Sequence, residues 1–487
     1  MKRAVAIVAI LATGCTTMEP KYVRPDASIP ASWPVGDPYL VASEAGLPAL
    51  TYRQVFTDPR LQTLIAEAIA NNRNLRTAAA NIAAAREQYR IQRANQFPLV
   101  NASGGATVSG DRGGGSGVSA SYSAGVSVPS FEIDLFGRLR SLTDVQLNRY
   151  FATEAGARAT RLTLVANVAN SWLDYAADSS LLRISTETAA SAQKSVQLTR
   201  IRLEGGIAPR TDLDQAEQIL SAAQADLARE RTAVAQDVNA LQLLVGAPVE
   251  PALLAGSIDD AFGKIAPVAP GLDSYVLLRR PDVVQAEYDL RAANANIGAA
   301  RAALFPRITL TGLLGFASSA LLKLFTGGAF GWSAGANADY TIFQAGAGHA
   351  NVRLTEAQRR AAVSTYQGTI QAAFRDVADA LARRGTINDE IAARQRQQAS
   401  TADTYLLTEA RYRAGIDPFL NVLDAQRSYY SAQQTLVNIK LTAAQNIVAT
   451  YQAVGGDTLL EGTPICQRLP GDTGQPNAVL GEECLPD

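Results

Sequence analysis

The sequence predicts a mixed α/β membrane protein in which each of two similar halves supplies a strand hairpin and a long helical hairpin. Three observations predict this fold class. Long stretches are rich in Ala, Gln, Arg and Leu, a composition typical of extended helices rather than of a compact enzyme. Short motifs recur at a near-constant distance along the chain. Stretches of apolar/polar alternation, typical of membrane β-strands, follow a helical segment in each half.

The charge balance and the scarcity of reactive side chains exclude several function classes. The 487 residues carry a formal net charge of −1, whereas a nucleic-acid binder needs a basic face to neutralise phosphates. The only histidine is His349, and there are three cysteines, so a metal cluster or a His-based catalytic group has almost no residues to be built from. We therefore expect no enzyme activity, no cofactor, no metal site and no nucleic-acid partner.

The N-terminus has the features of an export signal followed by an extended arm. Residues 4–12 are apolar but too few to span a bilayer, and they follow the basic Met1-Lys2-Arg3. Leu11-Ala12-Thr13-Gly14-Cys15 resembles a bacterial lipobox, which predicts a lipoprotein-type signal peptide over residues 1–14 and a lipidated Cys15. The alternative is an ordinary signal peptide cut nearby, which gives export without an anchor. Frequent prolines predict an extended arm over residues 15–58.

The chain is a duplication of one half-protein unit. Arg202 to Pro209 (RLEGGIAP) aligns with Arg411 to Pro418 (RYRAGIDP) at a shift of 209 residues. Other motifs, such as the Phe-Pro pairs at 97–98 and 305–306, align at a nearly equal shift. Such agreement over a long stretch indicates a duplicated unit, and the period is far too long for a solenoid. The boundaries are predicted as a first repeat over 59–265, a second repeat over 266–456 and a Pro/Gly-rich tail over 457–487.

Each repeat opens with a helical segment, about 59–96 and 274–304, and continues with two alternating stretches. Apolar residues at every second position run from Val100 to Val108 and from Ile308 to Phe316, and they resume after each tip. This pattern indicates transmembrane strands with apolar side chains toward lipid; the alternative is a soluble hairpin with one buried face. Four strands cannot close a barrel and lipid does not tolerate open edges, so membrane insertion requires several copies.

The remaining residues are predicted to be helical. Two proline-free segments, about 138–203 and 345–413, predict helices of roughly 100 Å at a rise of ~1.5 Å per residue. Val363, Ile370 and Val377 recur every seven residues, which is typical of a coiled-coil seam. Each segment ends at Gly-Ile-x-Pro, and a returning helix follows over about 211–246 and 419–454.

The ordered set of motifs resembles the TolC superfamily, and specifically the OprM-like outer-membrane lipoproteins of tripartite efflux pumps of the RND (resistance–nodulation–division) type. The resemblance covers residues 15–456. It is carried by Phe131 to Arg138 (FEIDLFGR), Arg279 to Asp282 (RRPD), Arg411 to Gly415 with Leu423 to Arg427 (RYRAG and LDAQR), and Tyr451 to Gly456 (YQAVGG).

The resemblance implies a homotrimer whose twelve strands, four per chain, form one barrel in the bacterial outer membrane. A long periplasmic coiled-coil barrel of helices would continue it. The implied partners are a periplasmic membrane-fusion adaptor, an inner-membrane RND transporter and outer-membrane lipid. The implied function is an exit duct that passively conducts small toxic compounds to the exterior. The alternatives are a non-conducting structural or surface lipoprotein, and a duct for secreted peptides or metal ions.

The resemblance also assigns a periplasmic gate to Leu420 and Asp424, which stack on one helix face because they are four residues apart. Three leucines would block water and three carboxylates would attract cations. The alternatives are helix packing for Leu420 and a solvated charge for Asp424. Gln215 aligns with Asp424 in the first half, so the charge comes mainly from the second half. Asp212 and Asp214 lie near enough in sequence to add to it.

The helix-ending turns are predicted to dock the adaptor, although a tight turn needs glycine whether or not anything docks. The residues assigned to this surface are Arg411, Tyr412, Gly415 and Ile416, with Gly205, Gly206 and Ile207 as their first-half equivalents. Beyond the resemblance, Cys466 and Cys484 in the tail can form a disulfide in an oxidising periplasm or remain free thiols.

Overall fold

A computed structural model describes residues 17–27, 29–30, 51–110, 118–266 and 274–456. The predicted signal peptide, Cys15, Cys466 and Cys484 lie outside these residues. The chain divides into two compact units that do not follow the sequence repeats, because each unit takes segments from both halves. Unit 1 comprises Met1–Asp26, Ala80–Ala155 and Val284–Gly368, and unit 2 comprises Ala27–Ala79, Gly156–Val283 and Thr369–Asp487.

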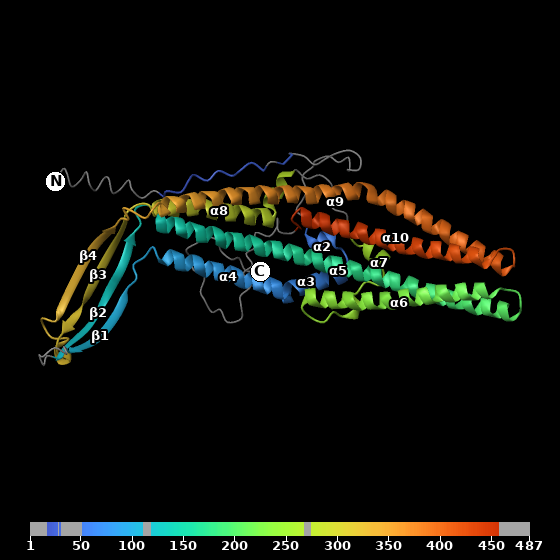
Figure 1. Cartoon of the computed structure of the whole chain (residues 1–487), viewed down its shortest axis with the longest axis horizontal. Coiled ribbons are helices and arrows are strands. Elements are labelled where there is room, and N and C mark those ends of the chain that lie inside the picture. Colours follow the sequence, from blue (N-terminus) through green and yellow to red (C-terminus); the bar gives the residue numbers. More distant parts are fainter. Residues whose placement is uncertain (1–16, 28, 31–50, 111–117, 267–273, 457–487) are drawn as a thin grey trace. The chain divides into compact units, whose positions relative to one another are not determined.

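Unit 1 contains a sheet of four antiparallel strands in the order β1-β2-β3-β4 (Figure 1). The strands are β1 (Asn101–Gly110), β2 (Val118–Ile133), β3 (Arg307–Ser318) and β4 (Phe330–Asp339). Each half of the sequence supplies one hairpin, and β2 pairs with β3 to join the two hairpins. The prediction of four strands per chain is confirmed.

The strand register gathers apolar side chains on one face of the sheet. Ala102 pairs with Val126, Val126 with Leu314, and Leu314 with Trp332, and directly paired residues point to the same side. The neighbouring row on the opposite face consists of Ser103 and three glycines. Trp332 is 73% exposed, so the apolar face has no cover among the described residues. Such a face is suited to a lipid environment.

Two local devices shape this sheet. Gly125 and Gly315 face each other across β2 and β3, and a Cβ atom on Gly315 would lie 2.7 Å from the Ala124 carbonyl oxygen, so only glycine permits this approach. The register shifts between Val128 and Phe131, around a proline that has no N–H to donate.

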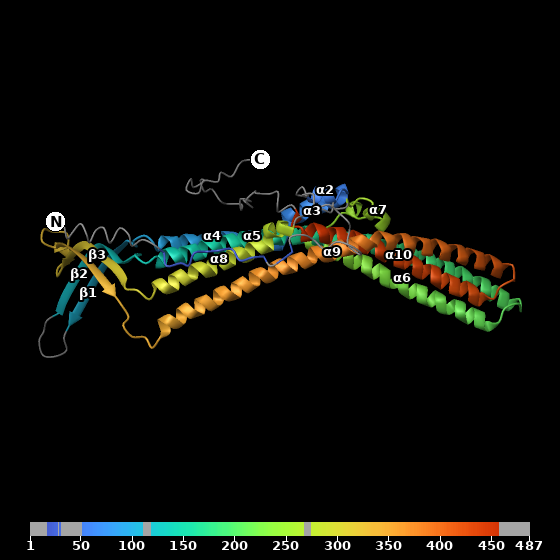
Figure 2. The same cartoon turned by 90° about the horizontal axis from the view of Figure 1, so that it is seen from above.

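The long helices are α5 (Arg138–Glu204) and α9 (Ala347–Arg413), each of 67 residues (Figure 2). They return through α6 (Arg210–Val245) and α10 (Phe419–Ala453). All four bounds lie close to those predicted from the absence of proline and the Gly-Ile-x-Pro stops. Part of α5 and part of α9 belong to each unit.

The coiled-coil seam of α9 contains more buried positions than the sequence predicted. Tyr366, Ile370, Ala373, Val377 and Ala380 are all buried and alternate in steps of four and three, as heptad core positions do. The burial of Ile370 and Val377 confirms the predicted seam. Val363, which was assigned to the same seam, is only partly buried.

Unit 2 has the largest apolar core. Trp172 of α5 is fully buried and its indole N–H donates to the Leu253 carbonyl oxygen at 2.9 Å. The rings of Phe56 and Tyr451 meet edge to face with centroids 5.4 Å apart. The short elements around this core are α2 (Tyr52–Val55), α3 (Pro59–Asn71), η1 (Pro251–Leu253) and α7 (Ile258–Phe262).

The opening segment of each repeat differs from the single helix expected. In the first half, Asn72 separates α3 from α4 (Arg73–Ala94), because its side chain accepts from the Leu75 N–H at 3.1 Å and donates to the Leu244 carbonyl at 2.8 Å. In the second half, a 3₁₀ turn, η2 (Ser274–Arg279), precedes α8 (Pro281–Ala302). Within the described residues, no helix combines the length and the apolarity needed to cross a bilayer.

Candidate functional site

The two helical hairpins of unit 2 end in tip turns of the same backbone conformation. Gly206 and Gly415 adopt φ angles of +71° and +74°. In the first turn, the N–H of Ile207 donates to the Arg202 carbonyl at 2.9 Å, and in the second Ile416 donates to Arg411 at the same distance. These bonds satisfy carbonyl groups left over at the helix ends, as in a Schellman-type turn. The duplicated motif therefore folds into duplicated geometry.

The Tyr412 side chain is part of the core of the tip. It is 5% exposed, and its ring lies 5.1 Å from the Phe419 ring. Both rings join a cluster of buried side chains from α5, α6, α9 and α10. The sequence assigned Tyr412 to the docking surface, but the ring is covered by its own hairpins. The ring packs in the tip core, and the docking role assigned to Tyr412 stays a prediction.

The arginines at equivalent positions in the two tips make different bonds. Arg411 donates to the Asp417 carboxylate of its own turn at 2.6 Å and holds the pKa of that carboxyl below its usual range. Arg202 instead donates to the Tyr412 carbonyl at 3.1 Å, and its guanidinium carbon lies 4.6 Å from the centre of the Tyr412 ring. Arg202 therefore joins the first tip to the second, whereas Arg411 binds only within its own turn.

The outer end of the tips is apolar and exposed. Ile207 and Ile416 are 71% and 63% exposed, and we call this pair the docking apex. Gly205, Gly206, Arg411 and Gly415 are exposed beside it. Exposed isoleucines in adjoining turns are suited to burial against another protein.

Leu420 and Asp424, which we call the gate pair, both lie on the exposed side of α10. Leu420 is 59% exposed although its neighbour Phe419 is buried. Asp424 is exposed one helical turn further along, between the buried Leu423 and Ala425. The gate pair therefore faces away from the tip core, as a residue that lines a passage or a contact between copies must.

The first hairpin has different chemistry at the equivalent positions. Thr211 and Gln215, shifted by 209 from the gate pair, carry neither apolar bulk nor charge. The nearby Asp212 has a pKa raised by burial, an effect that the Arg202 charge opposes. Asp214 lies 3.8 Å from Arg210.

Three hydroxyl contacts tie the four helices together behind the tips. Ser191 of α5 lies 3.0 Å from the Tyr405 hydroxyl of α9, and Ser185 lies 3.1 Å from the Tyr430 hydroxyl of α10. Tyr430 in turn donates to Asp226 of α6 at 3.1 Å. The two hydroxyl–hydroxyl bonds contribute about 1 kcal/mol each and the bond to the Asp226 carboxylate somewhat more, and together they fix the helix register.

A group of carboxyls lies between α5 and α6, farther from the tips. Burial, together with the nearby Asp178 and Asp174, raises the pKa of Asp237 to about 7. Asp174 accepts from the Gln445 side chain at 2.7 Å. Among the described residues, no group of three or more His, Cys, Asp or Glu side chains is placed to hold a metal ion.

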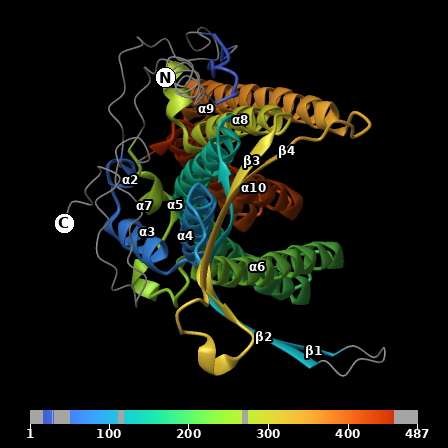
Figure 3. The ribbon, with the colours of Figure 1, turned by 90° about the vertical axis from the view of Figure 1, so that its left-hand side faces the viewer.

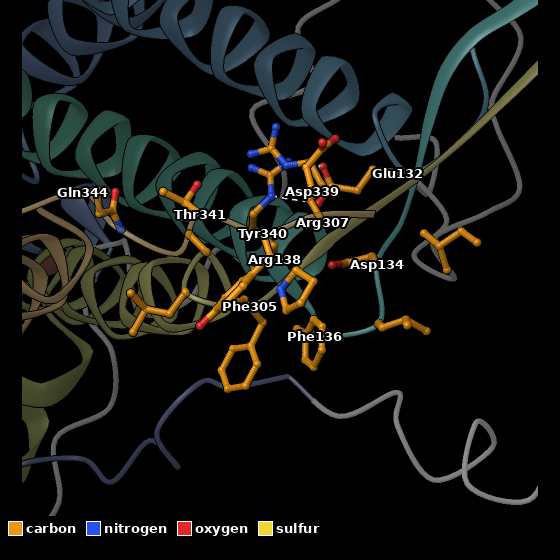
Figure 4. Close-up of a pocket in the computed structure, with 16 residues that line it drawn as sticks. Glu132, Asp134, Phe136, Arg138, Phe305, Arg307, Asp339, Tyr340, Thr341 and Gln344 are labelled. Carbon is orange, nitrogen blue, oxygen red and sulfur yellow. Dashed lines mark hydrogen bonds and ion pairs between the residues drawn. The ribbon is translucent and has the colours of Figure 1, made fainter. Parts of the chain in front are cut away.

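A cavity of about 260 Å³ lies in unit 1 where the strands meet the helices (Figure 4). Arg138, the first residue of α5, donates to Glu132 of β2 at 2.7 Å, and Arg307 of β3 lies 3.4 Å from the same carboxylate. Asp134 accepts from the Arg140 N–H at 2.9 Å and so caps the first turn of α5. Within unit 1, these contacts join strands β2 and β3 to the start of helix α5.

The sequence did not predict the contacts that Arg202, Asp417 and Phe419 make in the tips. The alignment of Arg202 with Arg411 was a signal that the position matters. The different partners of the two arginines depend on the spatial neighbourhood of the two tips, which no sequence pattern contains.

Comparison with known proteins places these features among related chains. The family model described as "Outer membrane efflux protein" matches residues 64–247 and 273–456. The chain is 41% identical over 460 residues to the probable efflux pump outer membrane protein TtgC of Pseudomonas putida, covering 93% of this chain and 95% of the relative. It is 37% identical over 449 residues to the cation efflux system protein CusC of Escherichia coli K12, covering 92% and 98%.

The solved structures agree in fold. The open state of the MtrE outer membrane channel of Neisseria gonorrhoeae superposes with a TM-score of 0.82 at 34% identity, covering 91% of this chain and 99% of that one. Both matches of the family model fall on corresponding halves, which agrees with the internal duplication. The predicted fold class and the predicted resemblance are confirmed.

Proposed function

The chain belongs to the outer membrane efflux protein family, and we propose that three copies assemble into the exit duct of a tripartite efflux pump. Its outer-membrane efflux role follows from the family. The number of copies rests on a physical argument. Four strands with an uncovered apolar face and two free edges must be completed by other copies, and three copies supply twelve strands.

The gate pair carries the mechanism that we propose. In a trimer, three Leu420 side chains on the exposed face of α10 narrow the periplasmic end of the duct and exclude water. Three Asp424 carboxylates one turn away attract cations and disfavour anions. The observation that carries this proposal is the exposure of both residues on a helix whose opposite side is buried in the tip core.

The docking apex supports a periplasmic adaptor as partner. Ile207 and Ile416 present apolar side chains at the end of the hairpins, where a second protein can bury them. An inner-membrane RND transporter supplies energy through that adaptor. Lipidation of Cys15 anchors the mature protein to the membrane.

Small toxic compounds are the proposed cargo. Relatives of similar identity are named for different cargo: one TtgC is named as a toluene efflux pump outer membrane protein, and CusC as a cation efflux system protein. The gate pair selects by charge rather than by chemical class, so it does not by itself choose among these cargoes. A duct for metal ions or secreted peptides is the second candidate, and a non-conducting lipoprotein is the third.

Single-channel recording of the purified full chain in a planar bilayer tests the proposal. We expect a small conductance in the wild type and a several-fold larger one in Leu420→Gly/Asp424→Ala. The oligomer mass should be about three times the 51.5 kDa of one chain. A folded, membrane-extracted oligomer that does not conduct in either form would favour the non-conducting structural or surface lipoprotein.

A further inference from the structure

The connection between β3 and β4, residues 319–329, is an ordered turn at the end of the sheet away from the helices; we call it the outer loop. The Ala317 N–H donates to the Ala329 carbonyl at 2.9 Å across its base, and the Thr326 hydroxyl donates to the Lys323 carbonyl at 2.8 Å. A 3₁₀ turn, η3 (Leu321–Lys323), forms its apex (Figure 3). These bonds hold its side chains in fixed directions.

The outer loop folds over the apolar face of the sheet. The Phe325 ring meets the Phe316 ring edge to face, with centroids 5.4 Å apart. Phe316 pairs with Phe330 and lies two residues from Leu314, so it lies on the same apolar face of the sheet as Trp332, in the adjacent cross-strand row. Phe325 therefore continues the lipid-facing surface past the ends of the strands.

The outer loop is far more apolar than an exposed turn normally is. Leu322 is 95% exposed and Phe325 is 72% exposed, while Leu324 is buried beneath them. Lys323 carries the single charge of the loop and stands directly beside Leu322. A cation within an apolar cluster at a membrane boundary is suited to lie at headgroup level while its neighbours enter the acyl region.

We infer that the outer loop inserts into the outer leaflet of the outer membrane, where it binds the phosphorylated, multi-acylated glycolipid of that leaflet. The apolar side chains contact acyl chains and Lys323 binds a phosphate. The inference rests on the proposed function, in which these strands belong to a membrane barrel. Continuity with the lipid-facing surface, through the Phe316–Phe325 contact, favours lipid over a neighbouring copy as the occupant.

Lipid retention by the purified full-length oligomer tests this inference. The wild type, Lys323→Glu and Leu322→Ser/Phe325→Ser are placed in nanodiscs that contain hexa-acylated lipid A and phosphatidylglycerol, and the lipid bound after mild extraction is measured by mass spectrometry. We expect lipid A retention to fall about five-fold in Lys323→Glu, since one lysine at an anionic surface is worth about 1 kcal/mol. Phosphatidylglycerol is also anionic, so its retention should fall too, but by less than that of lipid A. Lys194→Glu, an exposed lysine of α5, is the control and should match the wild type.

Equal lipid A retention in all variants would overturn the inference while leaving an inserted, conducting oligomer intact. Loss of the trimer in the loop variants would also overturn it, by showing that the outer loop is a contact between copies. Failure of the wild type to insert or conduct would instead contradict the proposed function.

Discussion

The two helical hairpins share their geometry and differ in their polar chemistry. Helices α5 and α9 have the same length, and both hairpins align residue by residue at a shift of 209. Asp178 and Glu230 of the first hairpin occupy the positions of Ile387 and Ile439 in the second, where those isoleucines form a buried apolar cluster. Asp237 similarly replaces Asn446. At the tips, Thr211 and Gln215 stand where the second hairpin has the gate pair.

The comparison indicates that the duplication has preserved the backbone of the two hairpins while their side chains have diverged. The tip turns keep the same glycine conformation and hydrogen bonds because a helical hairpin of this length needs them. The gate that we propose lies in the second hairpin, and Asp237, a carboxyl with a raised pKa, lies in the first. Arg202 links the two tips, since it donates a hydrogen bond to the Tyr412 carbonyl of the opposite tip.

The largest difference is expected in the stability lost on truncating Tyr412 and its first-tip equivalent, Leu203. Tyr412→Ala removes a buried ring from the tip core and should destabilise the second hairpin by roughly 3 kcal/mol or more. Leu203→Ala, at the equivalent first-tip position, removes a partly buried side chain and should cost distinctly less. Thermal unfolding followed by circular dichroism checks the pair, and equal shifts in midpoint would break the comparison. Tyr412→Phe should be nearly neutral, because the hydroxyl has no hydrogen-bond partner among the described residues.

The raised pKa of Asp237 predicts a pH dependence that arises in the first hairpin. The folded pKa of Asp237, about 7, exceeds the unfolded value of about 3.9, so the folded chain binds the extra proton. The contribution of Asp237 to the free energy of unfolding is therefore fully present below about pH 4 and is lost as the pH rises through about 7. Asp237→Asn should remove this loss and add ~1–2 kcal/mol at pH 8, a value reduced for solvent screening.

The converse variant sharpens that prediction. Asn446→Asp replaces the donor that binds the Ala380 carbonyl at 3.1 Å, so it should destabilise the protein at pH 8 and less so at pH 4. Both variants are followed by unfolding midpoints across this pH range. A pH profile of Asp237→Asn that equals the wild type would contradict the assignment.

The bond between the tips predicts a smaller effect on gating. Arg202→Gln removes a hydrogen bond and a cation–π contact worth about 1 kcal/mol, so the second hairpin should part more often and raise the open probability. Arg411→Gln breaks a pair confined to its own exposed turn and should change gating less. Single-channel open times measure both, and a larger effect of Arg411→Gln would reverse the roles given to the two tips.

The smallest difference is expected where the hairpins are alike. Gly206→Ala and Gly415→Ala each force a side chain into the left-handed region, at a cost of about 1 kcal/mol. A Cβ atom meets nothing within 4 Å at either position, so strain alone sets the cost. Unfolding midpoints of the two variants should therefore coincide. Unequal shifts would show that the turns are not equivalent.

Much of the fold was predictable because it depends on local pattern. The absence of proline fixed the extent of α5 and α9, and period-two alternation located the four strands. The break at Asn72 was not predictable, since it depends on a hydrogen bond to Leu244, far along the chain. In the site, the tip glycines followed from the motif, whereas the burial of Tyr412 and the reach of Arg202 depend on the packing of four helices.

We propose that the gate lies mainly in the second hairpin, at Leu420 and Asp424. The most direct test compares the conductance of Leu420→Gly/Asp424→Ala with that of Thr211→Gly/Gln215→Ala, the matched change in the first hairpin, in the same bilayer. We predict a several-fold rise for the former and a wild-type value for the latter. Equal increases, or a larger increase from the first hairpin, would contradict the claim.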